Sequence, residues 1–186
     1  MVGNRLELDI VGLFNDDVGA SYSINEIARR LNKKYPYIHK KVTSFLKDGI
    51  LQETIIGRSH LCSINLENDE AILLLSLNAA KRKSESLKKD ARVRQILAHL
   101  IDVGEEKGAV AIIQRGENIL FIADGKAPFL DLKHVQVLSK DAYQKEVLAN
   151  PGLQQTTVIL YSFERYYSLM KEIQGKLRMA YLFKKK

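Results

Sequence analysis

Apolar residues recur with helical spacing in three segments near the start of the chain. The first covers residues 4–15. The second begins at Ser23-Ile24-Asn25-Glu26, where a serine followed three residues later by a glutamate predicts a capping box. The third begins at Pro36, a residue that suits the first turn of a helix, and ends at Gly49. In this third helix the spacing i, i+4, i+7 and i+8 predicts one buried face, made of Ile38, Val42, Phe45 and Leu46.

Two β-prone runs follow, residues 50–56 and 61–66, and the polar segment Gly57-Arg58-Ser59-His60 separates them. Because a short glycine-containing turn between two such runs is typical of a hairpin, we expect a hairpin with residues 57–60 at its tip. A further helix is predicted over residues 68–86. The change to a polar, basic character after it predicts a domain boundary near residue 87, with domains of residues 1–87 and 88–186.

Helices and strands alternate in the second half of the chain. The pattern predicts a helix from Val93 to about Gly104 and a last helix from Phe163 to about Tyr181. Between them we expect a helix that begins at Ser139, and short strands at Ala109–Gln114, Asn118–Ala123, Val135–Leu138 and Thr157–Tyr161. Together the two halves predict an α+β chain, in which the second half is a small α/β domain.

Charge is distributed unevenly along the sequence. The 186 residues carry a net charge of +7, with an isoelectric point near 9.4. Residues 1–22 have one base and four acids, a charge of −3, whereas residues 23–60 have eight bases and three acids, a charge of +5. A basic surplus concentrated in a short N-terminal stretch and at the tail favours a polyanion partner. The terminal Lys184, Lys185 and Lys186 are expected to add non-specific affinity for phosphate.

Composition excludes several classes of protein. A single cysteine, Cys62, excludes an intramolecular disulfide and a cysteine-built zinc site, and its place in a strand predicts an inert, buried thiol. The longest near-apolar stretch, residues 71–80, is half the length of a membrane span. The first ten residues contain acids where a signal peptide has an apolar block. We therefore expect a cytoplasmic protein that has no membrane partner.

The order helix, helix, helix, hairpin over residues 4–66 resembles a winged helix-turn-helix. Residues 23–31 resemble the first helix of the motif, with Ala28 as the small residue where two helices cross. Residues 37–51 resemble the recognition helix and its exit into the wing. The resemblance implies binding of double-stranded DNA, either sequence-specific or chromatin-like, by a prokaryotic or archaeal type of transcriptional regulator.

Polar and cationic side chains on the outward face of the third helix have the chemistry to donate to phosphates and reach base edges. The wing tip would add contacts to phosphate or the minor groove. The predicted DNA-binding residues are Ser23, Lys33, Lys34, Tyr35, Tyr37, His39, Lys40, Lys41, Thr43, Ser44, Lys47, Arg58, Ser59 and His60. Tyr35 and Tyr37 fit a partly buried position equally well. If roughly six Lys and Arg side chains contact phosphates, log K should fall with log salt at a slope of about −5.

Residues 90–170 resemble a minimal nucleotidyltransferase domain. The likeness is carried by the helix from Val93, by strand 109–114, by residues 134–143 and by the strand, turn and helix of residues 158–167. The family's chemistry needs a Gly-Ser turn after the first strand and an Asp-x-Asp pair that binds two magnesium ions. This sequence contains neither, and Tyr161-Ser162-Phe163 lacks the family's glycine. We therefore expect a degenerate domain without cofactor or metal, used for dimerisation or ligand sensing.

Two alternatives to a DNA-binding regulator remain open. One is a nucleotidyltransferase-type enzyme with an altered metal site, and the other is a winged helix that binds a protein. Other chemistry has no support, because the four histidines lack metal spacing and the sequence has no phosphate-binding loop or nucleophile elbow. We expect no catalytic residues, a small-molecule effector as a further partner, and a homodimer. Its seam would be the helix at 68–86, through Ala71, Ile72, Leu74, Leu75 and Leu77, or the C-terminal helix.

Overall fold

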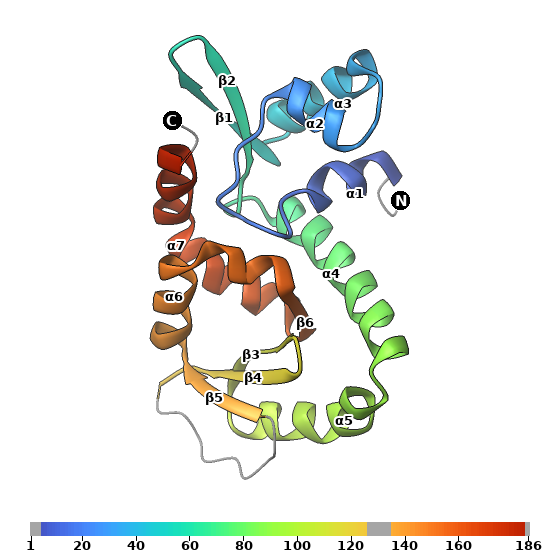
Figure 1. The fold of residues 1–186 in the computed structure, drawn as a ribbon, viewed down its shortest axis with the longest axis vertical. Helices are drawn as coiled ribbons and strands as arrows, with labels where there is room; N and C mark the ends of the chain where they lie inside the picture. The colour runs from blue at the N-terminus through green and yellow to red at the C-terminus, as the bar shows by residue number, and fades with distance from the viewer. Residues whose placement is uncertain (1–4, 126–134, 185–186) are drawn as a thin grey trace. The chain divides into compact units, whose positions relative to one another are not determined.

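A computed structural model describes residues 5–125 and 135–184 of the chain, as an α+β structure (Figure 1). His134 and the tail residues Lys185 and Lys186, which the sequence analysis singled out, lie outside the described residues, as does the side chain of Lys184. The chain divides into two compact units. Unit 1 is Met1–Leu75 with Lys171–Lys186, and unit 2 is Ser76–Met170.

This division differs from the boundary expected near residue 87. That position lies inside helix α4 (Asp69–Lys89), which continues past the predicted end of the helix at residue 86. The second half of helix α7 (Phe163–Lys184) belongs to unit 1, although the sequence places it far from residues 1–75. Local patterns do not report packing between residues so distant in sequence, and so they could not assign α7.

Three helices open unit 1: α1 (Arg5–Gly12), α2 (Ile24–Arg30) and α3 (Tyr35–Lys47). The predicted capping box is present before α2. The backbone N–H of Glu26 donates to Ser23 Oγ at 3.2 Å, and that of Ser23 donates to Glu26 Oε2 at 2.8 Å. Helix α3 buries Ile38, Val42 and Phe45 as predicted, whereas Leu46 is half-buried. Gly49 follows it with a φ of +72°, which glycine adopts without strain.

The hairpin consists of β1 (Leu51–Ile56) and β2 (Ser59–Ile64), which pair antiparallel. Its turn is shorter than expected. Ser59 and His60, predicted at the tip, lie within β2 opposite Ile56 and Ile55, so Gly57 and Arg58 alone form the turn. Gly57 has a φ of +60° at the first turn position, where glycine allows a tight two-residue connection. An isolated bridge from Tyr22 to Cys62 adds a short pairing on the other side of β2.

The last turns of α7 complete the core of unit 1. The side-chain amide of Gln174 donates to the carbonyl oxygens of Val18 at 3.0 Å and Ile64 at 2.9 Å, and its oxygen accepts from the backbone N–H of Leu66 at 3.4 Å. Gly19 lies so close to the helix that a Cβ atom would fall 2.7 Å from the backbone of Leu177. These buried contacts make this half of α7 an integral part of unit 1.

Unit 2 contains a four-stranded mixed sheet in the order β5-β4-β3-β6. Strands β3 (Ala109–Arg115) and β4 (Asn118–Ala123) are antiparallel, and β6 (Thr157–Tyr161) is antiparallel to β3. On the far side of β4, strand β5 (Val135–Ser139) runs parallel to it. The helical elements between and around them are α5 (Ala91–Glu106), α6 (Lys140–Ala149) and the 3-10 helix η1 (Pro151–Thr156).

Helices cover both faces of this sheet, α5 on one face and α6 with the first half of α7 on the other (Figure 1). Val93, Leu97 and Leu100 of α5 pack in one cluster with residues of β3, β4 and β6. Strands covered on both faces become almost wholly apolar, which explains the continuous buried run of β3. At the turn from β6 to α7, Ser162 adopts a φ of +58°, a conformation that glycine takes without strain.

Every helix in the described part of the chain is too short or too polar to cross a lipid bilayer.

Candidate nucleic-acid interface

The outward face of α3 carries cationic and hydroxyl side chains. Because successive residues of a helix are rotated by about 100°, Lys40, Thr43 and Lys47 lie opposite the buried residues of α3. All three are exposed. The sequence of α3, from Tyr35 to Lys47, contains no acid. This face is therefore positively charged, and it spans about 20 Å along the helix axis.

The approach to α3 adds further positive charge. Lys33 and Lys34 are both exposed in the segment that precedes the helix. Lys34 is the N-cap, and its side chain makes no capping hydrogen bond to the first turn. A helix N-terminus with uncapped N–H groups attracts anions such as phosphate. Tyr37, 68% exposed, lies on this first turn.

Two predicted DNA-binding residues of α3 have partners within the protein. The Lys41 ammonium lies 2.6 Å from Glu7 Oε1, and both side chains are about one-quarter exposed. The same ammonium is 5.6 Å from the centre of the Phe45 ring. Ser44 Oγ donates to Asp48 Oδ2 at 3.1 Å. Lys41 therefore belongs to the flank of α3 that faces α1, unlike its neighbour Lys40.

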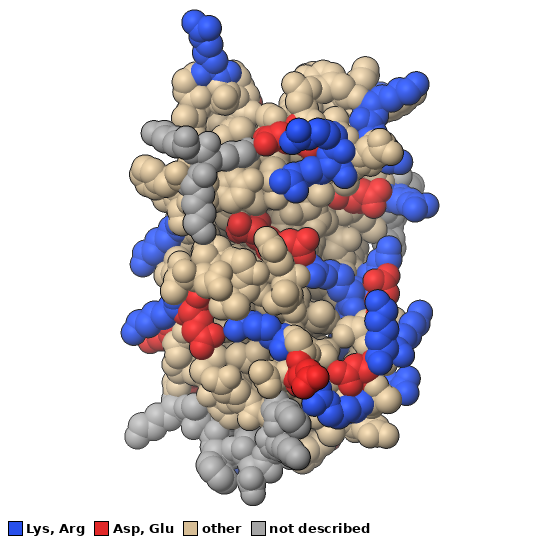
Figure 2. Space-filling view, in the orientation of Figure 1, with Lys and Arg blue, Asp and Glu red and all other residues tan. Residues whose placement is uncertain are grey.

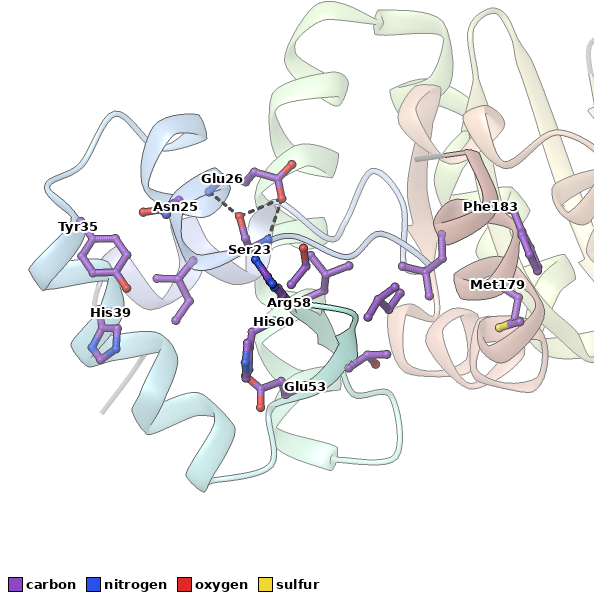
Figure 3. A pocket seen from close by; sticks show the side chains of 16 residues that line it. Ser23, Asn25, Glu26, Tyr35, His39, Glu53, Arg58, His60, Met179 and Phe183 are labelled. Atoms are coloured by element: carbon purple, nitrogen blue, oxygen red, sulfur yellow. Dashed lines mark hydrogen bonds and ion pairs between the residues drawn. The ribbon is translucent and has the colours of Figure 1, made fainter. Parts of the chain in front are cut away.

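A second group of predicted residues lines a groove in unit 1 of about 1070 Å³ (Figure 3). These are Ser23, Tyr35, His39, Arg58, Ser59 and His60. Figure 3 shows Tyr35 and His39 at one end of the groove, Met179 and Phe183 at the other, and His60 with Glu53 between them. The groove thus has walls from the starts of α2 and α3, from the hairpin and from the end of α7.

Carboxylates also line this groove. Glu53 Oε1 lies 3.0 Å from His60 Nδ1, a pair that joins the two strands of the hairpin. Glu26 accepts from Ser23 in the capping box. With neutral histidines, Glu26, Glu53 and Arg58 give the lining a charge of −1. Apart from Lys41 and Ser44, the predicted residues therefore fall into two sets, a basic set on and before the outward face of α3 and a set inside a weakly acidic groove.

The sequence analysis did not identify Glu53, Met179 or Phe183 as parts of a site. Glu53 alternates along β1 with residues of the opposite face, a pattern that any half-exposed strand shows. Met179 and Phe183 come from α7, which reaches this groove only through the packing of Gln174 and Leu177 in unit 1. Their unusual exposure, 54% and 66%, is visible only in the structure.

The predicted seam in α4 is corrected by the structure. Ala71, Leu74 and Leu75 are buried within the chain itself, because they complete its own core. They are consequently not available as a surface between two copies. In the same helix Leu73 is 54% exposed, and Ile72 and Leu77 are half-buried.

Basic and acidic side chains are intermixed over the face of the molecule drawn in Figure 2, rather than gathered into one block. The positive charge of α3 and of the residues before it is therefore a local feature of this surface. Comparisons with known protein families, with curated proteins and with solved structures find no match for this chain.

The remaining reactive groups are buried or dispersed. Burial, followed by the nearby charge of Glu53, raises the pKa of the Cys62 thiol to about 11. In unit 2 the hydroxyls of Tyr143 and Tyr166 lie 3.0 Å apart, and burial raises the pKa of both. Within residues 5–125 and 135–184, no three His, Cys, Asp or Glu side chains come together in a way that would hold a metal ion.

Proposed function

We propose that this protein binds double-stranded DNA through α3 and the β1–β2 hairpin of unit 1, in the manner of winged helix-turn-helix regulators of transcription. The observation that carries the proposal is the acid-free outward face of α3, where Lys40, Thr43 and Lys47 are exposed side by side. Lysine and threonine at such positions contact phosphates and base edges when a helix enters the major groove.

The arrangement around α3 supports the same proposal. Three helices precede a two-stranded hairpin, and the bridge from Tyr22 to Cys62 extends that hairpin on its inner side. Arg58 stands exposed at the tip of the hairpin, where an arginine would reach phosphate or the minor groove. The exposed cations on or near the proposed interface are Lys33, Lys34, Lys40, Lys47 and Arg58.

A homodimer on two half-sites would complete this function, since single modules of this kind seldom reach high specificity. Unit 2 would then serve as a degenerate nucleotidyltransferase-like domain with a structural or sensing role. Its turn at Ser162 has the backbone conformation that the family's glycine would favour, which supports that assignment. A location with the DNA in the cytoplasm follows from the same proposal.

The test is fluorescence anisotropy on a labelled duplex of random sequence at low salt. The variant Lys40→Ala/Lys47→Ala removes two charges from the proposed interface. The matched control Lys88→Ala/Lys89→Ala removes two exposed charges from the last turn of α4. We expect the wild type and the control to bind similarly, and the interface variant to bind at least about tenfold more weakly. Equal binding by the two variants, or absence of wild-type binding, would contradict the proposal.

A further inference from the structure

The groove in unit 1 has the size of a ligand pocket. Its volume of about 1070 Å³ is just above the range for small-molecule sites, roughly 300–1000 Å³. Four separate segments of unit 1 build its walls, as described above. Its lining also includes Arg58, which the proposed function places at the DNA interface, so a molecule in the groove would occupy the edge of that interface.

One end of the groove is apolar and uncovered. At this end Met179 and Phe183 of α7 are 54% and 66% exposed, and Ile56 of β1 is a further lining residue that is 37% exposed. All three line the groove, together with Leu182. Large apolar side chains that gather at one concave surface are typical of a binding site, whereas isolated ones are not informative. This end would pack against the flat or aliphatic part of a ligand.

Aromatic rings form the other end, and carboxylates lie between the two ends (Figure 3). The rings of Tyr35 and His39 have centres 5.5 Å apart. Glu53 is held between them and the apolar end by its contact with His60. The whole chain has a net charge of +7, whereas the residues that line the groove have a net charge of −1. Carboxylates and aromatic faces together favour a cation, because both attract positive charge, and they disfavour an anion.

We infer that this groove binds a flat aromatic cation, with its rings against Met179 and Phe183 and its charge near Glu53. Such a ligand would also exclude the duplex, because Arg58 of the proposed DNA interface lines the same groove. The site itself stands independently of the proposed function, and only the exclusion of DNA depends on it.

The binding test compares two dyes that share one ring system, the cation rhodamine 6G and the dianion fluorescein, by fluorescence polarisation with the full chain. We expect saturable binding of rhodamine 6G and much weaker binding of fluorescein. Glu53→Gln should weaken rhodamine 6G binding about fivefold through the lost charge, and Phe183→Ala about tenfold through the lost ring. The matched controls Glu85→Gln and Leu73→Ala change exposed residues of α4 and should leave it unchanged.

Equal affinity for the two dyes, no saturable binding, or unchanged binding in both groove variants would overturn the site. Phe183 is two-thirds exposed at the end of α7, so its removal should not unfold the protein, and a circular dichroism melt checks this.

The exclusion is tested with unlabelled rhodamine 6G against a duplex that carries a spectrally separate label. The dye should weaken duplex binding by the wild type but not by Phe183→Ala. Phe183→Ala is the control, because any direct effect of the dye on DNA would be the same for both proteins. Unchanged duplex affinity of the wild type with dye bound would overturn the exclusion. Dye binding without any duplex binding would instead support the ligand site and refute the proposed function.

Discussion

Lys40 and Lys41 are adjacent in sequence and identical in charge, yet the structure predicts different effects on DNA binding. Lys40 is exposed at the centre of the outward face of α3, whereas Lys41 is paired with Glu7 at 2.6 Å. If Lys40 contacts a phosphate, Lys40→Ala reduces the slope of log K against log salt by about 0.9. Lys41→Ala breaks a contact within the protein and should leave the slope unchanged.

The size of the difference follows from the same relation. Between 50 and 200 mM salt, a fourfold change, one lost phosphate contact alters the affinity ratio of wild type to variant by about 3.5-fold. We therefore expect this ratio to shrink about 3.5-fold for Lys40→Ala and to stay constant for Lys41→Ala. Glu7→Gln should release Lys41 and make the slope steeper, by at most about 0.9.

The assay is an anisotropy titration of one labelled duplex at several salt concentrations between these limits. Thermal unfolding serves as a control, because Lys41→Ala should lower the free energy of unfolding by up to about 1 kcal/mol while Lys40→Ala should not. A slope that changes equally for the two variants would refute the assignment of different roles to the neighbouring lysines. An unchanged slope for Lys40→Ala would remove the central contact of the proposed interface.

Four further predictions concern stability and reactivity. Ser162→Gly should raise the free energy of unfolding by about 1 kcal/mol, measured by urea denaturation, because it relieves a φ of +58°. Gly19→Ala should lower it by more than about 2 kcal/mol, since the added Cβ would meet the Leu177 backbone at 2.7 Å. Gln174→Leu should lower it by about 3 kcal/mol, because a backbone donor and two backbone acceptors lose the same buried partner. Cys62, with a pKa raised to about 11, should resist iodoacetamide at pH 8 in the folded protein and react after unfolding; its contribution to stability should be lost as the pH rises from about 8.5 toward 11.

Signals that depend on neighbouring residues predicted the elements well. Ser23 and Ser139 both cap helices as their sequences indicate, since an N-cap needs only a side chain and an N–H three residues later. The hairpin is also predicted, but the expected turn, residues 57–60, is longer than the observed turn, residues 57 and 58. A polar Ser-His pair suits a turn and an exposed strand equally, so only the pairing register decides between them.

Signals that depend on distant residues were not available from the sequence. Helical periodicity separates the outward and buried faces of α3, but it does not show that Glu7 lies beside Lys41. Nor does periodicity show the groove, because two of its lining residues, Glu53 and Phe183, are far apart in the sequence. The same holds for α4, whose apolar stripe indicates a buried face without telling whether the same chain or a second copy covers it.

The position of Gln174 has a consequence for protein synthesis. Residues 1–75 leave the ribosome before α7, yet the carbonyl groups of Val18 and Ile64 obtain their amide partner from a residue made 156 and 110 positions later. Helices α1 to α3 and the hairpin therefore remain incompletely packed until α7 has been synthesised. Nascent chains would be expected to need protection during that interval, and a gene fragment that encodes the first 75 residues alone should yield an unstable product.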